Sequence, residues 1–579
     1  MSILRSLYDY QVWLDSQSDA AKPGCAMIDL AFAVHLDDKG NFRGLTDLRN
    51  ETKKRGTPYL TTALVPRSGK YAWQTVNVGW EYREYILGVS KDGPDEKSAQ
   101  KLGSFKASLE ELCDKLTGEA ARQAAAIRAF YADENNLERV KADPLYPDCR
   151  AFTKCCMTFQ VGDSETLFAC LPGILDYVGS SHSEDSGADG PKARCLLTGE
   201  FAPFAMLHPY TPIQGSQAIA KIASWQKDSG YDSYGHKQGE NAPVSVKAAE
   251  MYGRAFDKLR KSPDHAVYLG NETCLFWTQP QDEQFENAVH MFIYSITKDR
   301  DDLKSQLSAF KSAVCGGHYS NASGDLKLYI LTPNRARIAV RVEAEMSIAE
   351  AAERLAQHFI DSSVADSTDT AILWPLNHLF LQLTLDGKVS SLPRAWYGSY
   401  IDSIFSGNQY PMSMYYAILR KIRQTCKISD AMAGALKGYL TRDPNSSKGD
   451  YTLALNESNT APSYLCGRVT ALIEKSVNDI APNLGTLFGQ KHFSQVTANP
   501  GLVIPQLLRV YQRQLAATPY LQRQIAEIMD NIETMPTHLT SMEQGSFVLG
   551  YYQQRQALYR KRATPEDGSV VSLSVKDAE

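Results

Sequence analysis

The sequence predicts an α+β protein, with a mixed α/β body toward the N-terminus and an all-helical C-terminal part. Two patterns predict it. Alternating apolar residues, typical of half-buried strands, recur to about residue 343, whereas helical spacing dominates from 345 and almost no strand pattern follows 394. We therefore predict a body over 1–393, a basic helical connector over 394–450, a helical bundle over 451–563 and a disordered acidic tail over 564–579.

The body is expected to begin with an amphipathic helix, because the apolar residues from Ile3 to Leu14 share helical spacing. A strand pair over 26–48 follows, and then a polar helix over 104–131 with a buried apolar stripe. Further strands are expected near 152–161, 266–277, 288–297 and 326–343, and a loop or disorder over 180–194.

Prolines mark helix starts in the C-terminal part, since proline fits the first turn of a helix. We expect helices to begin at Pro462, Pro505 and Pro519. Thr540 and Glu543 have the spacing of a capping box, which predicts the start of the last helix. Because the connections are short, these helices should pack as antiparallel neighbours in a bundle.

The composition excludes several classes of protein. A formal net charge of −5 lacks the basic balance of autonomous nucleic-acid binders, so any nucleic-acid contact must come from local basic patches. The 11 cysteines form no CxxC pair, which excludes zinc-ribbon and thioredoxin-like sites and indicates free thiols in a reducing compartment. No apolar run approaches the roughly 18 residues of a membrane span, and we expect a cytoplasmic protein without membrane contact.

Motifs for catalysis are missing from the sequence. It contains no GxxxxGK phosphate loop, no HExxH helix and no GxSxG elbow. Ser98 and Lys101 match the SxxK pattern but stand in a charged segment without the companion motifs. We therefore expect no catalytic residues, no metal and no cofactor, while a site assembled from residues distant in the sequence stays open.

A first candidate for nucleic-acid contact is the basic and aromatic loop at 67–74. Arginine and lysine bind phosphates or guanine edges, glutamine can pair with adenine, and tyrosine or tryptophan can stack on an opened base. The alternative is a surface turn whose aromatic rings pack underneath. The candidate residues are Arg67, Ser68, Lys70, Tyr71, Trp73 and Gln74.

A second candidate is the glycine-rich segment over 229–245. Glycines among small polar residues allow backbone N–H groups to approach a phosphate or base edge, and amide side chains can bond a base. The alternative is an ordinary glycine-rich connection. The candidate residues are Lys237, Gln238 and Asn241.

Two further candidates are rows of basic residues. Arg335, Arg337 and Arg341 should share one face of a strand, with Ile338 and Val340 on the opposite, core face. A helix over 416–427 lies in the region 394–450, which has eight basic against four acidic residues. The alternatives are a partner-facing edge and a solvated helix face. The candidates on this helix are Arg420, Lys421 and Arg423.

The last predicted helix also carries a basic cluster, at Arg555, Arg560, Lys561 and Arg562. Arg560 and Arg562 are the residues we expect to line the path of a DNA strand. The alternative is that the cluster complements the dipole at the C-terminal end of the helix.

Several long segments are jointly specific for one family. They are LYDYQVWL (7–14), SYGHKQGENAPVS (233–245), TCLFW (273–277), LYILTPNRARIAVR (328–341), RAWYGSYIDSIFSGNQYPMSMYYAILRKIR (394–423), GRVTALIEKS (467–476) and FVLGYYQQRQALYRKR (547–562). On these segments the chain resembles the large-subunit family of the type I-C CRISPR Cascade over nearly its whole length. The segments 77–88 and 225–232 depart from the family pattern.

The resemblance implies a non-catalytic DNA-recognition subunit. Such a subunit would recognise the protospacer-adjacent motif (PAM) on double-stranded DNA, promote R-loop formation with crRNA, guide the displaced non-target strand and help to recruit an effector helicase-nuclease. The implied partners are crRNA, target DNA, the Cascade backbone subunits, the 5′-handle-binding subunit, the small subunit and phage anti-CRISPR proteins. The bundle over 451–563 resembles the small subunit, which in this family is often also made from an internal start.

Two other function classes stand beside this one. The first is a metal-dependent nuclease that acts on the displaced strand. The second is a scaffold that bridges subunits without touching DNA.

Overall fold

The computed structural model describes residues 2–17, 24–52, 54–65, 67, 71–184, 191–225, 233–295, 300–366, 370–384, 387–447 and 449–560. The chain divides into two compact units. The N-terminal unit comprises residues 2–211 and 223–257, and the C-terminal unit comprises residues 212–222 and 258 onward. Each unit combines strands with helices, which confirms the predicted α+β class. The predicted tail over 564–579 lies outside the described residues, and the boundaries near 393 and 450 stay predictions.

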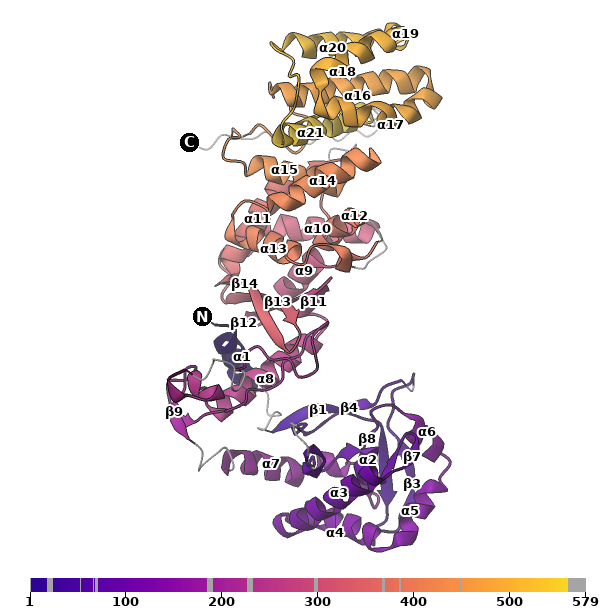
Figure 1. Cartoon of the computed structure of the whole chain (residues 1–579), viewed down its shortest axis with the longest axis vertical. Helices are drawn as coiled ribbons and strands as arrows, with labels where there is room; N and C mark the ends of the chain where they lie inside the picture. The colour runs from indigo at the N-terminus through magenta and orange to yellow at the C-terminus, as the bar shows by residue number, and fades with distance from the viewer. Residues whose placement is uncertain are drawn as a thin grey trace, which may run out of the picture. The chain divides into compact units, whose positions relative to one another are not determined.

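The N-terminal unit contains a four-stranded sheet in the order β3-β2-β8-β5 (Figure 1). β2 is antiparallel to β3 and parallel to β8, and β5 is antiparallel to β8. Phe105 of α3 and Phe130 of α4 both pack their rings within 6.3 Å of the Phe159 ring on β8, so these helices form the core with the sheet. The elements are β2 (Phe32–Leu36), β3 (Phe42–Asp47), β5 (Glu81–Tyr82), β8 (Cys156–Val161), α3 (Glu96–Lys115) and α4 (Gly118–Ala132).

Shorter elements complete this unit. The N-terminal helix is present as predicted and buries Ile3, Leu7 and Tyr10. The strands are β1 (Cys25–Leu30), which pairs with β4 (Thr57–Thr62), β6 (Val89–Ser90) with β7 (Gly93–Pro94), and β9 (Lys192–Arg194) with β10 (Phe201–Pro203). The helices are α1 (Ile3–Gln17), α2 (Arg83–Ile86), α5 (Glu134–Lys141), α6 (Tyr146–Ala151), α7 (Pro172–Glu184) and α8 (Val246–Lys261).

Three expectations for this unit were wrong in detail. The helix over 104–131 is two helices, because Leu116 and Thr117 are extended between α3 and α4. Gly118, the first residue of α4, takes a left-handed φ of +60°. The first strand of the pair over 26–48 is broken at Ala31, where the chain passes from the β1–β4 pair to the larger sheet. The expected loop at 180–194 is helical up to Glu184, since α7 continues past its last apolar residue.

The C-terminal unit begins with an antiparallel sheet in the order β11-β12-β13-β14. Its core contains sheet residues such as Phe276 and Leu328 together with Phe285, Phe310 and Phe359 of the helices. The Phe310 ring packs against the rings of Phe285 and Phe359. The expected strand at 288–297 is wrong, because Asp282 caps a helix there by accepting the Phe285 backbone N–H at 3.0 Å. The elements are β11 (Ala266–Leu269), β12 (Glu272–Gln279), β13 (Asp325–Asn334), β14 (Arg337–Ser347), α9 (Glu283–Ile293), α10 (Arg300–Cys315) and α11 (Ile348–Ser362).

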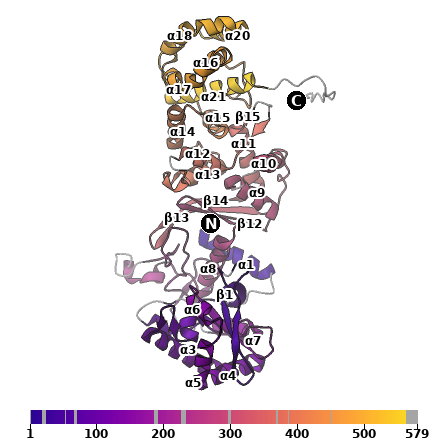
Figure 2. The same cartoon turned by 90° about the vertical axis from the view of Figure 1, so that its right-hand side faces the viewer.

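Regular structure after residue 394 is helical throughout the described residues, as predicted. It follows a short strand pair, β15 (Val364–Ala365) with β16 (Ala371–Ile372), and α12 (Leu376–Leu383). The helices are α13 (Trp396–Ser406), α14 (Met412–Thr425), α15 (Asp430–Thr441), α16 (Pro462–Ile480), α17 (Pro482–Ala498), α18 (Pro500–Val510), α19 (Gln512–Ala517), α20 (Pro519–Asp530) and α21 (Ser541–Leu558). Both views show α16 and α21 grouped with α17, α18 and α20 (Figure 1 and Figure 2).

Close packing of α16 against α21 organises this bundle. A Cβ atom at Gly467 would lie 2.1 Å from the Phe547 carbonyl oxygen, and one at Gly550 would lie 2.3 Å from that of Tyr464. Glycine at both positions therefore allows the two backbones to touch.

The predicted helix starts have a mixed outcome. Pro462 and Pro519 begin helices, and the capping box at Thr540 is confirmed, since Thr540 N–H donates to Glu543 Oε2 at 2.7 Å. Pro505 instead lies inside α18, whose first turn is opened by Pro500. Helix α17 was not predicted. No helix in the described part of the chain is both long and apolar enough to cross a membrane.

Candidate nucleic-acid interface

The loop at 67–74 uses its arginine internally. The guanidinium of Arg67 is ion-paired with Glu81, whose side chain is fully buried, and stands 4.6 Å from the centre of the Tyr85 ring. Glu81 also accepts the backbone N–H of Asn77 at 2.9 Å. Arg67 is therefore the counter-charge of a buried acid. Tyr71 and Gln74 are exposed and Trp73 is half-buried, while Ser68 and Lys70 lie outside the described residues.

The glycine-rich loop is held by its own side chains. Asn241 donates its amide N–H to the Gln238 carbonyl oxygen at 3.0 Å, and Lys237 N–H donates to Glu240 Oε2 at 2.7 Å. A Cβ atom at Gly239 would lie 2.1 Å from the Ala205 carbonyl oxygen, so only glycine fits there. The amide of Asn241 thus serves the loop, while Lys237 is exposed and Gln238 is partly exposed.

An aromatic residue in this loop was missed as a candidate. Tyr234 is 99% exposed and adopts a left-handed φ of 56°, which is costly for a residue with a bulky side chain. An exposed ring held in such a conformation is a suitable stacking platform for a base. Its position in a glycine-rich segment was a signal that the sequence already contained.

The arginine row at 335–341 is a hairpin tip rather than one strand face. Arg335 takes a φ of 56° in the two-residue turn between β13 and β14, and Arg337 is the first residue of β14. The pairing passes from Leu331–Val340 to Ile330–Val342, so Arg341 stands in a bulge. This irregularity leaves Val340 36% exposed, which corrects its predicted place in the core. All three arginines are exposed.

A lysine distant in the sequence joins this tip. The segment 212–222 runs beside the turn, since Lys221 N–H donates to the Ala336 carbonyl oxygen at 3.2 Å and Gln217 N–H donates to that of Arg335 at 3.0 Å. Burial lowers the pKa of Lys221. Lys221, Arg335 and Arg337 form what we call the basic tip. No sequence pattern indicated that residue 221 belongs to it.

Arg341 has a different neighbourhood within the same hairpin. Glu272 on β12 is buried and accepts the Gly398 backbone N–H at 3.0 Å and the Thr332 hydroxyl at 3.2 Å. Burial raises the pKa of Glu272, while these bonds and the charge of Arg341 oppose that rise. The buried Glu272 carboxylate is therefore held mainly by the Gly398 and Thr332 donors, and the charge of Arg341 contributes least.

Among the basic residues of α14 and the last helix, some bond to neighbouring elements and others are exposed. Lys421 is half-buried and donates to the Thr384 carbonyl oxygen at 2.8 Å, whereas Arg420 and Arg423 are exposed. Arg423 also donates to Gln544 Oε1 of α21 at 3.4 Å. The expected cluster on the last helix is wrong in part, because α21 ends at Leu558 and Arg560 follows it. Arg562 lies outside the described residues.

These placements leave the basic tip as the strongest candidate surface. Exposed guanidinium groups at a turn can reach phosphate oxygens without rearrangement of the core, whereas Arg67 cannot leave Glu81 unpaired. In the described ranges, no group of three or more His, Cys, Asp or Glu residues is arranged to hold a metal ion.

Comparison with known proteins identifies the family. A family model described as CRISPR-associated protein (Cas_Csd1) matches residues 7–559. No curated protein matches the chain. The family match confirms the resemblance at the level of a CRISPR-associated protein, and the subtype I-C stays a prediction. Because the match covers nearly the whole chain, both units included, this protein belongs to the CRISPR-associated Cas_Csd1 family.

Proposed function

We propose that this protein is the large, non-catalytic subunit of a type I-C Cascade in the cytoplasm. In this role it recognises the PAM on double-stranded DNA, promotes unwinding and R-loop formation with crRNA, and guides the displaced strand. It also helps to recruit the helicase-nuclease. Its other partners are the backbone subunits, the 5′-handle-binding subunit and the small subunit, and phage anti-CRISPR proteins would target the same assembly.

The observation that carries this proposal is the family match over residues 7–559. The charge distribution supports it, because a chain of net charge −5 that presents a few arginines at one hairpin tip is suited to weak, local contact with DNA. Avidity would then come from the assembled complex, and sequence specificity along the target from guide pairing.

Within this role we assign phosphate contact to the basic tip and base contact to the glycine-rich loop. Arg335 and Arg337 supply charge without sequence preference. Gln238 offers a donor and an acceptor to a base edge, and Tyr234 offers a ring for stacking.

The test is a mobility-shift assay of the assembled complex, with and without this subunit, on duplexes that carry a library of motifs. We expect loss of target binding without the subunit. With Gln238→Ala, preference should change at one base pair of the motif by about 1–3 kcal/mol, whereas Arg337→Ala should weaken all motifs alike. Unchanged binding without the subunit would indicate a scaffold, and a uniform loss with Gln238→Ala would remove the loop from motif reading.

The remaining assignments concern the C-terminal bundle and catalysis. We assign the displaced strand to the bundle over 451–563, with Arg560 and Arg562 on its path. Charge reversal of both residues should leave motif binding intact and lower the yield of the R-loop, as measured by permanganate footprinting. Purified protein incubated with single-stranded DNA and Mg²⁺ or Mn²⁺ should leave the DNA intact, and cleavage would favour the nuclease instead.

A further inference from the structure

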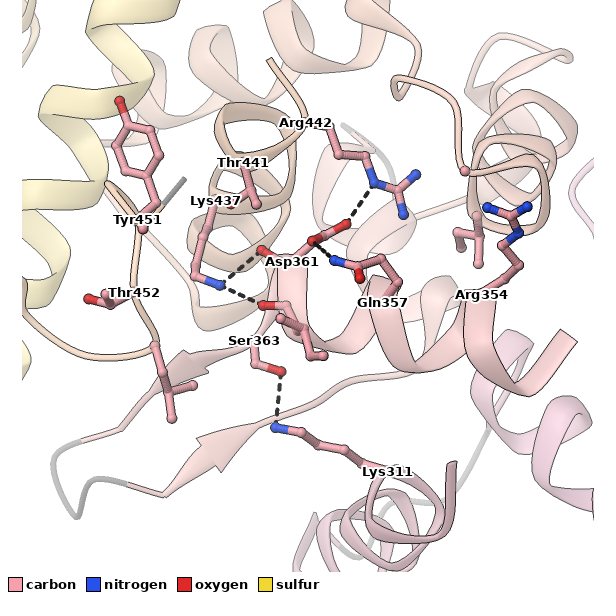
Figure 3. Close-up of a pocket in the computed structure, with 15 residues that line it drawn as sticks. Lys311, Arg354, Gln357, Asp361, Ser363, Lys437, Thr441, Arg442, Tyr451 and Thr452 are labelled. Carbon is pink, nitrogen blue, oxygen red and sulfur yellow. Dashed lines mark hydrogen bonds and ion pairs between the residues drawn. The ribbon is translucent and has the colours of Figure 1, made fainter. Parts of the chain in front are cut away.

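A cavity in the C-terminal unit gathers positive charge. It has a volume of about 680 Å³ and is lined by residues of α10, α11, α13 and α15 and by the segment 449–453. Figure 3 shows its polar side chains. Among the described lining residues, four carry cationic groups, Lys311, Arg354, Lys437 and Arg442, and one carries a carboxylate, Asp361.

Lys437 is held inside the cavity wall with its charge near the end of a helix. Its side chain is buried, and its Nζ donates to the carbonyl oxygens of Ile360 at 2.7 Å and Asp361 at 3.0 Å in the last turn of α11. Burial lowers the pKa of Lys437 to about 8, Asp361 opposes this, and the nearby Lys311 adds to it. The two lysines are thus close enough to repel each other across the cavity wall.

Arg442 is fixed in orientation but not fully bonded. Its Nε donates to Asp361 Oδ2 at 2.8 Å, its Nη1 donates to the Ser403 carbonyl oxygen at 2.7 Å, and its guanidinium lies 4.2 Å from the centre of the Tyr410 ring. Its side chain is 10% exposed. In the part of the chain that the structure describes, its buried Nη2 has no hydrogen-bond partner, and neither has Nε of Arg354.

An unpaired N–H group on a buried cation such as Arg442 is costly, and an oxyanion would satisfy it. Arg354 is partly exposed and can reach the same oxyanion from the open side. The apolar side chains of Ile404 and Leu453 and the Tyr451 ring also lie in the lining. The Thr441 hydroxyl adds a neutral donor. A volume of this size is in the range of small-ligand sites, roughly 300–1,000 Å³.

We propose that this cavity binds a nucleotide carrying a phosphate monoester. The phosphate lies against Arg354, Arg442 and the two lysines, and the base lies against the apolar residues. Asp361 is a positioning residue. Its carboxylate accepts hydrogen bonds from Arg442 Nε at 2.8 Å and from the Gln357 side-chain N–H at 2.7 Å (Figure 3). The phosphate could belong to a free mononucleotide or to the 5′ end of a nucleic-acid strand.

Calorimetric titration of the full-length protein tests this proposal with four probes: inorganic phosphate, AMP, adenosine, and a short oligonucleotide with or without a 5′ phosphate. We expect saturable binding of AMP or of the 5′-phosphorylated oligonucleotide, and none of adenosine. Binding of AMP indicates the free nucleotide as the source, and binding of the phosphorylated oligonucleotide alone indicates a strand end. Absence of binding by both phosphate esters, or equal binding of adenosine, would overturn the proposal.

Variants separate this site from general charge. Arg354→Gln and Lys311→Gln should each weaken the phosphate ester about tenfold, because each removes one charge-assisted contact. Arg509→Gln, an exposed arginine on α18, is the matched control and should bind like the unaltered protein. Circular dichroism spectra should coincide for all three variants, because Arg354 and Lys311 are partly exposed and make few internal bonds. Unchanged affinity in both cavity variants would overturn the proposal.

Discussion

The loop at 67–74 and the β13–β14 hairpin both place arginine beside aromatic or apolar residues, yet they use it in opposite ways. Arg67 is enclosed and neutralises the buried Glu81. Arg335 and Arg337 stand at an exposed turn where the core begins only at Ile338. A basic residue in a turn-rich segment therefore indicates a binding surface only when no buried acid lies within its reach.

The largest effect should come from separating the pair in the N-terminal unit. Arg67→Met should lower the free energy of unfolding by about 3–5 kcal/mol, because it leaves the Glu81 carboxylate buried without its counter-charge. Hydrogen exchange followed by mass spectrometry should show faster exchange in peptides around β5. Arg335→Met is the control and should change stability by less than about 0.5 kcal/mol.

A double variant decides whether Arg67 acts through Glu81. Arg67→Met combined with Glu81→Gln should recover part of the lost stability, since no buried charge then remains. Strictly additive losses would break the comparison, because Arg67 would then contribute by packing alone.

A buried histidine in the C-terminal unit should make the stability of the protein depend on pH. His358 is buried with its Nδ1 2.7 Å from the Tyr410 hydroxyl, and burial lowers its pKa to about 3. Between that value and the ordinary 6.5, only the unfolded chain binds the proton, so stability falls as pH falls through this window. Relative to His358→Gln, the unaltered protein should lose about 2 kcal/mol more between pH 7 and pH 5. Parallel pH profiles in urea unfolding would contradict this.

Binding to DNA tests the exposed arginines of the β13–β14 hairpin. Arg337→Ala in the assembled complex should weaken target binding about tenfold at low salt, and the slope of log affinity against log salt should fall by about one unit. An unchanged salt slope would remove the basic tip from the DNA surface.

The smallest effect is expected on α14, which repeats the comparison in two adjacent residues. Lys421→Gln should cost about 1 kcal/mol of stability, because its ammonium donates to the Thr384 carbonyl oxygen. Arg420→Gln should cost less than about 0.5 kcal/mol. Thermal unfolding of both variants measures the difference, and equal losses would show that the Thr384 contact contributes nothing.

Elements with a strong local signal could be predicted from the sequence. The amphipathic N-terminal helix and the capping box at Thr540 depend on residues close together in the chain. The strand pattern at 326–343 was predicted, but the turn at Arg335 that divides it into β13 and β14 was not. The prediction of a strand at 288–297 was wrong because apolar and aromatic residues fit a strand and a buried helix equally well. The cap at Asp282 is the feature that indicates a helix.

The candidate site was less accessible to sequence reasoning than the fold. Arg67 is ion-paired with Glu81, and Lys221 lies more than a hundred residues before the turn that it joins. Burial of Glu81 is a property of the folded core, which no local window contains. The bulge at Arg341 likewise arises from the register with β13.

The N-terminal unit is built from two separate stretches of the chain, so residues that contact each other in it are synthesised at different times. Its first helix is tied to its last segment, because Asp15 meets Arg254 at 3.5 Å and the Gly24 N–H donates to Glu250 at 3.0 Å. At a translation rate of roughly 5–20 residues per second, these partners follow the N-terminus by about 10–50 s. Throughout that interval Asp15 and Gly24 are on the nascent chain without these partners. The contiguous helices from α16 to α21 have a shorter delay, because α21 begins at Ser541 and α16 ends at Ile480.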